Sequence, residues 1–206
     1  MSIPVALATP LAERTYISVL DLFRVGWQGL KFPLGQTPDF WDPDPEMGDR
    51  RYALGHVATP VVSRNPLIVL GMNPSDANHA TSDRTVNTII AASSTLGHDG
   101  WLMLNLYPER ATSPRDLKTF NKGLWLENWA VIDSQLDRFG ATEVLGAWGN
   151  PPNATIKKAA AMTLEALRAK VVRVYYFGSP TAAGSPRHSA PRGPKWEVSG
   201  TKNWLL

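Results

Sequence analysis

Apolar residues are grouped in two different ways along the chain from residue 67 onwards. Four short runs are almost wholly apolar, and between them apolar residues recur every three or four positions. Short apolar runs indicate strands buried on both faces, whereas the wider spacing is typical of amphipathic helices. The expected strands cover residues 67–71, 101–105, 143–148 and 171–177, and the expected helices cover residues 82–96, 124–139 and 153–170. This alternation predicts a three-layer α/β/α domain whose central sheet has four parallel strands.

Residues 1–50 follow a different pattern and are rich in Pro, Gly and Trp. We expect a short helix at 13–23 and an acidic loop, interrupted by prolines, at 42–46. The whole segment is predicted to be an arm or lid packed on one globular domain that spans residues 51–206. A chain of 206 residues suits such a single domain with a full core.

Composition narrows the class of protein. The chain has no cysteine, which excludes disulfides, thiolate zinc sites and iron–sulfur clusters and fits a reducing cytoplasm. No apolar run approaches the length of a membrane span, and residues 1–10 lack the pattern of a signal peptide. We therefore expect a cytoplasmic, monomeric protein that uses no cofactor or metal and does not bind a membrane.

Charge is unevenly distributed, although the net charge is only +3. Residues 1–150 carry 12 Lys/Arg against 16 Asp/Glu, whereas residues 151–206 carry 9 against 2. A basic C-terminal quarter favours a polyanionic partner such as DNA. Solvated surface lysines that serve only solubility are the competing interpretation.

The apolar run at 67–70 ends abruptly in Gly71-Met72-Asn73-Pro74-Ser75, which we call the elbow. Gly71 permits close approach of the backbone, and Pro74 restricts the turn that carries Asn73. Ligands of parallel α/β sheets bind at the carboxyl ends of the strands. The elbow therefore predicts that Asn73 points into an active-site crevice, with an ordinary strand exit as the alternative.

Four segments at expected strand ends resemble motifs of the uracil-DNA glycosylases, in the same order along the chain. Residues 71–74 are similar to the water-positioning motif of the single-strand-selective and mismatch-specific branches, and residues 102–105 are similar to the strand whose last Asn reads the flipped base. Residues 147–149 are similar to a Trp-Gly strand end, and residues 188–192 are similar to the loop that enters the minor groove. Within this fold the chain is most similar to an uncharacterised bacterial and phage family with an Arg-Tyr-x-Leu start and an Asn-Pro-Ser elbow. The resemblance covers about residues 51–195.

The resemblance implies a monofunctional DNA glycosylase that flips a pyrimidine nucleotide and cleaves the bond between base and sugar. Asn73 would position the attacking water, His188 would donate to O2 of the departing base, and Asn105 would pair with its Watson–Crick edge. Two departures from the family are visible. Asn73 stands where the most active branch has Asp, and Ser189-Ala190 replaces the usual Pro-Ser.

The other candidate residues are assigned by their place beside these motifs: Ser75, Met72 and Tyr107 to base binding, and Arg192, Arg187 and Lys195 to DNA binding. Asp76 is assigned a catalytic role, because it could supply the carboxylate that Asn73 lacks. Asp83 could do the same, but we favour a place at the start of a helix. Competing structural roles are a carbonyl-binding His188, a turn-capping Asn105 and a core Tyr107.

The substrate prediction depends on Ser75. Strict uracil enzymes have a bulky Tyr at this place, so the serine predicts a pocket that is open beside C5 of the base. An open wall favours a hydroxymethylated or glucosylated cytosine of phage DNA, and hence antiphage defence. The alternatives are repair of uracil or mismatched thymine, a nucleic-acid-binding module without the reaction, and a nucleotide hydrolase that uses Asp76 and Asp83 around a magnesium ion.

Overall fold

The computed structural model describes residues 30–44, 46–57, 65–190, 196 and 198–206. The helix expected at 13–23 and the basic stretch 191–195 lie outside the described residues. Within the described part of the chain, no helix is both long and apolar enough to cross a membrane.

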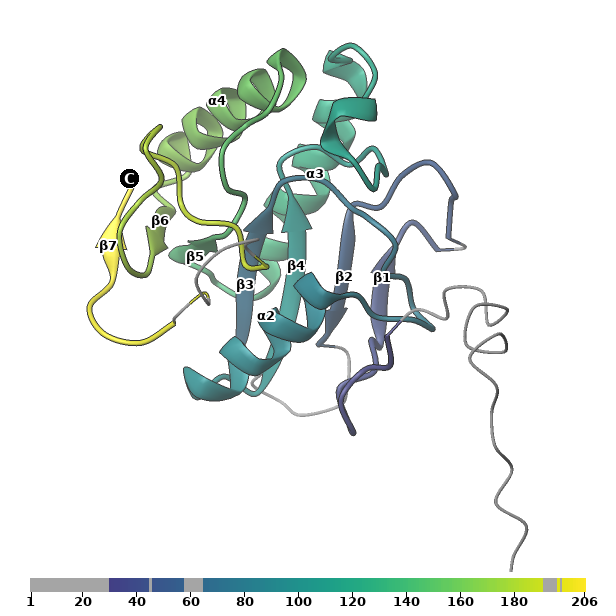
Figure 1. The fold of residues 1–206 in the computed structure, drawn as a ribbon, viewed down its shortest axis with the longest axis vertical. Helices are drawn as coiled ribbons and strands as arrows, with labels where there is room; N and C mark the ends of the chain where they lie inside the picture. Colours follow the sequence, from purple (N-terminus) through teal and green to yellow (C-terminus); the bar gives the residue numbers. More distant parts are fainter. Residues whose placement is uncertain (1–29, 45, 58–64, 191–195, 197) are drawn as a thin grey trace, which may run out of the picture.

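A seven-stranded mixed sheet forms the centre of the molecule, in the order β1-β2-β4-β3-β5-β6-β7 (Figure 1). Its four middle strands are parallel and match the expected ones: β3 (Pro66–Gly71), β4 (Gly100–Asn105), β5 (Glu143–Gly146) and β6 (Arg173–Tyr176). Three further strands pair antiparallel: β1 (Phe40–Asp42), β2 (Ala53–His56) and β7 (Asn203–Trp204). The α/β class is confirmed, but the expectation of a four-stranded, all-parallel sheet is wrong.

The three strands that the sequence pattern did not predict are only two to four residues long. Such short strands carry too few residues for an alternating or continuous apolar signal. In β2 the signal is weakened further by Gly55, which strands rarely contain. Here glycine is required, because a Cβ at position 55 would lie 2.7 Å from the backbone oxygen of Trp101 on β4. β1 belongs to the expected N-terminal arm, and residues 40–42 of that arm form an edge strand because β1 stands at one end of the strand order.

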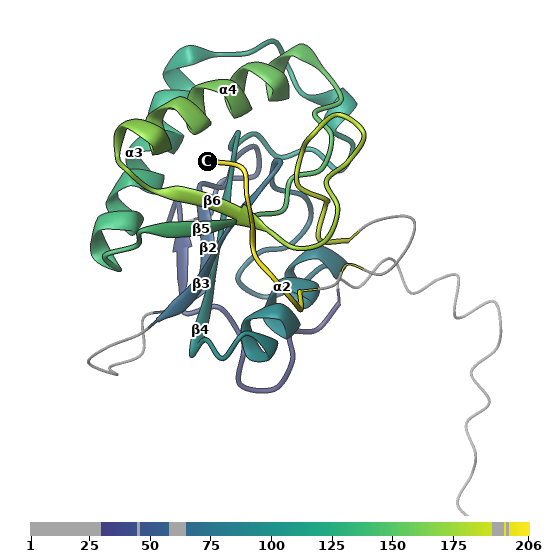
Figure 2. The ribbon, with the colours of Figure 1, turned by 90° about the vertical axis from the view of Figure 1, so that its left-hand side faces the viewer.

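The helices lie on both faces of the sheet, as predicted (Figures 1 and 2). The α-helices of the described residues are α2 (Arg84–Thr95), α3 (Lys122–Arg138) and α4 (Ala154–Ala169). Leu67 and Val69 of β3 pack in the core under α2, whereas Ile68 and Leu70 pack under α3 and α4. Both faces of β3 are therefore buried, which explains its continuous apolar sequence.

Capping residues set the helix ends. Asp83, Asn121 and Asn153 are the N-caps, and each side chain accepts a hydrogen bond from the backbone N–H three residues ahead. Gly97 and Gly140 follow α2 and α3 with positive φ angles, as expected of C′ residues. The prediction that Asp83 begins a helix is confirmed.

The connections that follow two neighbouring strands run to opposite faces of the sheet. β3 leads to α2 on one face, and its neighbour β5 leads to α4 on the other face. The loops that follow the two strands therefore diverge at their carboxyl ends, and this is where open α/β sheets bind ligands. The elbow follows β3, and residues 147–153 follow β5, at the edge of the sheet where the carboxyl ends of both strands lie.

Candidate functional site

A cavity of about 340 Å³ opens beside the elbow. This volume lies in the range of about 300–1,000 Å³ that is usual for small-molecule sites. Its wall is formed by the elbow, the first residues of α2, the loop after β4, Arg51 and residues 188–190. Residues from three of the four segments singled out in the sequence line this cavity, although the segments are far apart along the chain.

Asn73 lines the cavity, and its carboxamide has a defined orientation. The Nδ2 group donates to the backbone oxygens of Pro74 (3.0 Å), Ala111 (2.9 Å) and Glu109 (3.5 Å). Because three carbonyls surround this end, it must be the amino group rather than the oxygen. The Oδ1 atom has no hydrogen-bond partner among the described residues and remains an acceptor for a ligand or a water.

His188 lines the same cavity and presents a donor. Its Nδ1 accepts the backbone N–H of Ala190 (3.0 Å), so the proton of the neutral ring is on Nε2. Burial lowers the pKa of His188 below its usual value, against opposing effects of the Ala190 backbone and the Asp83 charge. The neutral imidazole with a free Nε2–H is thus the form expected at neutral pH.

Gly149 explains how the His188 loop reaches the sheet. Its φ angle is +73°, and a Cβ at this position would lie only 3.1 Å from Cβ of His188. The Gly149 N–H also donates to the backbone oxygen of Pro186 (3.0 Å). The Trp-Gly segment that follows β5 is therefore in direct contact with the histidine loop, which brings together two of the motifs identified in the sequence.

Asn105, the last residue of β4, lies beneath the cavity wall. It is fully buried, and neither its Nδ2 nor its Oδ1 has a hydrogen-bond partner among the described residues. A Cβ on Gly71 would lie 2.2 Å from Cε of Met103 and 3.1 Å from Oδ1 of Asn105, so both side chains occupy the space that this glycine leaves free. Met103 lines the cavity, and the unpaired carboxamide lies next to it. An unsatisfied buried amide is costly, which favours a functional role.

The two aspartates after the elbow lie in different places. Asp83 lines the cavity, where its Oδ2 accepts from the Ser75 hydroxyl (2.7 Å) and its Oδ1 accepts from the Val86 N–H (2.8 Å). Asp76 is not part of the cavity wall and instead accepts from the Thr112 hydroxyl (3.1 Å). The carboxylate that the fold brings to the candidate site is therefore Asp83, not Asp76.

The three other residues expected to bind the base also lie in different places. Met72 and Ser75 line the cavity, as expected. Tyr107 does not: its side chain is fully buried in the core, with its ring beside Phe120 and its hydroxyl accepting the Asn121 N–H (3.0 Å). The competing core role describes Tyr107 better, because a buried strand-end aromatic that is already hydrogen-bonded cannot stack on a ligand.

Of the three residues assigned to DNA binding, only Arg187 is described. Its side chain is exposed, and its Nε donates to the backbone oxygen of Ser179 (2.9 Å). Arg192 and Lys195 lie outside the described residues. Among the described residues, no group of three His, Asp or Glu side chains is close enough to hold a metal ion.

Sequence analysis missed two arginines at the site. Arg51 is only 3% exposed and lines the cavity, and Arg110 lies behind it. Both donate to the backbone oxygen of Ala77, and Arg110 also donates to that of Ser75 (2.9 Å). The sequence signals for Arg51 were the Arg-Tyr-x-Leu pattern at residues 51–54 and its place directly before the apolar stretch 52–54, where a continuing strand would bury it.

Comparison with known proteins identifies a family but no activity. A search of curated proteins gave no match, and neither did a search of solved structures. One family model matches residues 51–189, which is more than half of the chain, and its description is protein of unknown function (DUF1643). The match begins at Arg51 and ends one residue after His188, so both termini of the matched region lie at the cavity. The chain belongs to the DUF1643 family.

Proposed function

We propose that the protein is a monofunctional DNA glycosylase that flips a modified pyrimidine nucleotide into the cavity and hydrolyses its bond to the sugar. The observation that carries this proposal is the pairing of Asn73 and His188. One offers a fixed acceptor and the other a fixed donor to the same cavity. Hydrolysis at the C1′ carbon needs both: an acceptor that orients a water, and a donor that stabilises the departing base.

Each residue has a defined part in the step. The oxygen of a water held by Asn73 Oδ1 forms a bond to C1′ as the bond from C1′ to N1 breaks, and the electron pair stays on the base. The Nε2–H of His188 donates to O2 of that anion, and the proton released by the water passes to solvent. Asn73 cannot act as a general base, but an oxocarbenium-like transition state depends mostly on stabilising the leaving group.

Base recognition is assigned to Asn105. Its unpaired carboxamide supplies one donor and one acceptor, which matches the paired donor and acceptor on the edge of a pyrimidine. Met103 lies beside it and lines the cavity, so a side-chain movement of Met103 would open the path to a flipped base. Methionine adapts readily to such a change.

The sharper form of the proposal concerns the substrate. Ser75 places a small side chain in the cavity wall where a bulky one would exclude 5-substituted bases. This supports excision of hydroxymethylated or glucosylated cytosine of phage DNA, with antiphage defence as the role. Repair of uracil or mismatched thymine is the alternative. A nucleotide hydrolase is less well supported, because Asp76 and Asp83 do not share the cavity.

The test is incubation with otherwise identical oligonucleotides that each carry one candidate base, followed by heating in alkali. We expect strand breaks only after the alkali step, because a monofunctional enzyme leaves an abasic site. Among the described residues no lysine lines the cavity, so borohydride should trap no covalent adduct. Chelator should not abolish excision. DNA binding without abasic sites for any base would favour the inert binding module instead.

A further inference from the structure

Arg51 is the most unusual charged residue of the described chain. Its side chain is almost wholly buried, yet only its Nη1 has a hydrogen-bond partner, the backbone oxygen of Ala77. Its Nε is buried without a partner, and no carboxylate of the described residues lies within ion-pair distance of the guanidinium. Burial lowers the pKa of Arg51 to about 10, so the group is still charged at neutral pH. A buried cation with unused donors is costly unless a ligand completes it.

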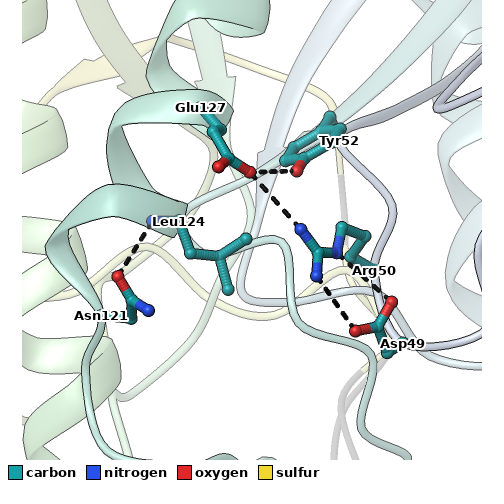
Figure 3. A network of polar contacts seen from close by, with 6 residues as sticks. All are labelled: Asp49, Arg50, Tyr52, Asn121, Leu124 and Glu127. Atoms are coloured by element: carbon teal, nitrogen blue, oxygen red, sulfur yellow. Dashed lines mark hydrogen bonds and ion pairs between the residues drawn. The ribbon is translucent and has the colours of Figure 1, made fainter.

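The fold holds Arg51 in this position from both sides. Its neighbours in the sequence point away toward α3, where Tyr52 donates to Glu127 (2.7 Å) and Arg50 forms an ion pair with the same carboxylate (3.5 Å) (Figure 3). The Arg51 N–H donates to the backbone oxygen of Pro108 (2.9 Å). Because side chains alternate along extended backbone, anchoring residues 50 and 52 on α3 directs Arg51 to the opposite side, into the cavity wall.

The cavity also contains a carboxylate, and this restricts the ligand. Asp83 is held by the Ser75 hydroxyl and the Val86 N–H, but a carboxylate has about four acceptor positions and two remain unused. An anionic ligand group would be attracted by Arg51 and repelled by Asp83. A cationic group would be repelled by Arg51 and attracted by Asp83. A neutral group that both accepts and donates hydrogen bonds suits the pair, and a hydroxyl group is such a group.

We infer that Arg51 and Asp83 determine specificity by binding a hydroxyl group on the 5-substituent of the base, with Arg51 donating to its oxygen and Asp83 accepting its proton. This inference rests on the proposed function for the orientation of the base. Ser75 provides the link, since the residue assigned to the C5 side donates directly to Asp83. Uracil and thymine carry no hydroxyl at C5 and would leave the buried guanidinium without a partner.

The test measures binding as well as excision. Single-stranded oligonucleotides with one cytosine, 5-methylcytosine, 5-hydroxymethylcytosine or 5-carboxylcytosine are titrated into the full-length protein and followed by fluorescence anisotropy. We expect the hydroxymethyl base to bind at least tenfold more tightly than the methyl base, since both have similar size. Equal affinities, or tighter binding of the carboxyl base, would overturn the inference.

Substitutions of Arg51 and Asp83 test whether these two residues cause the preference for 5-hydroxymethylcytosine. Arg51→Met keeps much of the volume and should abolish the hydroxymethyl preference, so that the variant binds 5-hydroxymethylcytosine and 5-methylcytosine equally. Asp83→Asn keeps an oxygen for the helix cap and should reduce the same preference, which preserves the test if Arg51→Met does not fold. Arg110→Met is the matched control, because Arg110 contacts the same Ala77 oxygen but does not line the cavity. An equal effect of Arg110→Met would contradict the assignment.

Failure of the inference and failure of the proposed function are distinguishable. Excision of several bases without any hydroxymethyl preference would overturn the inference and leave the glycosylase proposal standing. A hydroxymethyl preference that depends on Arg51, without abasic sites for any base, would support the inference and overturn the glycosylase proposal. In that case the cavity binds the modified base but does not hydrolyse it.

Discussion

At the scale of single residues, the site depends on the direction in which each polar group points. The three carbonyls around Nδ2 of Asn73 orient its amide, and the Ala190 N–H orients the ring of His188. These contacts also explain why an amide rather than a carboxylate suits position 73. A carboxylate oxygen in place of Nδ2 would face three carbonyl oxygens with no donor.

Substitution of Asn73 by Asp is therefore expected to destabilise the protein. Asn73→Asp should lower the free energy of unfolding by about 1–3 kcal/mol, because it replaces three favourable contacts by repulsion between oxygens. It should not increase the rate of excision. Thermal unfolding and single-turnover excision rates measure the two effects. Asn73→Ala is the control: it should lose excision, retain DNA binding and be more stable than the Asp variant. A faster and equally stable Asp variant would show that the carbonyls do not fix the amide.

His188 should give the site a characteristic pH dependence. Burial lowers its pKa in the folded state below the unfolded value of about 6.5, so the folded protein binds this proton less readily. Stability from the neutral ring is therefore present above pH 6.5 and is lost as the pH falls through that value toward the folded pKa. The excision rate should fall only below pH 6.5, where the ring charges and the Ala190 contact to Nδ1 is lost.

NMR titration of the His188 ring, together with the pH profile of excision, tests this expectation. His188→Gln keeps an N–H donor but has no proton to gain, so its residual activity should lack the acidic decline. A titration midpoint above 6.5, or the same acidic decline in the Gln variant, would contradict a neutral donor.

At the scale of secondary-structure elements, helix ends are mostly well matched to their residues, with one exception. Gly97 and Gly140 take positive φ angles after α2 and α3, but after α4 this conformation is taken by Val171, with φ of 60°. A β-branched side chain in the left-handed region is strained. Val171 is also 81% exposed, so little packing compensates for the strain.

Replacing Val171 by Gly and Gly140 by Val should change the free energy of unfolding in opposite directions. Val171→Gly should raise the free energy of unfolding by about 1 kcal/mol, because the removed strain exceeds the added flexibility of the unfolded chain. Gly140→Val is the matched control and should lower it by a similar amount, since a Cβ there meets no atom within 4 Å and only strain acts. Denaturant unfolding measures both, and excision should be unchanged. A destabilised Val171→Gly variant would refute the strain argument.

At the scale of the whole molecule, the carboxyl edge of the sheet carries both the cavity and exposed lysines. The Thr155 hydroxyl on α4 donates to the backbone oxygen of Lys118 (3.0 Å), and Nζ of Lys158 lies 4.7 Å from the centre of the Phe120 ring. Lys118, Lys157 and Lys158 are thus gathered from two segments into one basic surface at the start of α4. If the partner is DNA, this surface suits the phosphate backbone.

Lys157→Ala combined with Lys158→Ala should weaken DNA binding to all sequences alike. The magnitude of the slope of log affinity against log salt should fall by about 1.4–1.8, because each of the two lost phosphate contacts releases about 0.7–0.9 fewer counterions. Arg168→Ala is the control, since it is exposed at the opposite end of α4 and should leave the slope unchanged. Titrations at several salt concentrations provide the measurement. An unchanged slope in the double variant would place the DNA elsewhere.

The sequence by itself determined the elements whose signal is local. Continuous apolar runs identified β3 to β6, and capping residues such as Asp83 and Gly97 marked helix ends, because burial on two faces and backbone hydrogen bonding constrain neighbouring residues. It also placed Asn73 and His188 at strand ends and loops that lie at one edge. Tertiary structure decided what depends on distant partners. β1, β2 and β7 are short strands that pairing with a neighbour defines. The contacts of residues 50 and 52 with α3 direct Arg51 to the cavity wall. Asp83 rather than Asp76 faces the cavity because α2 begins there.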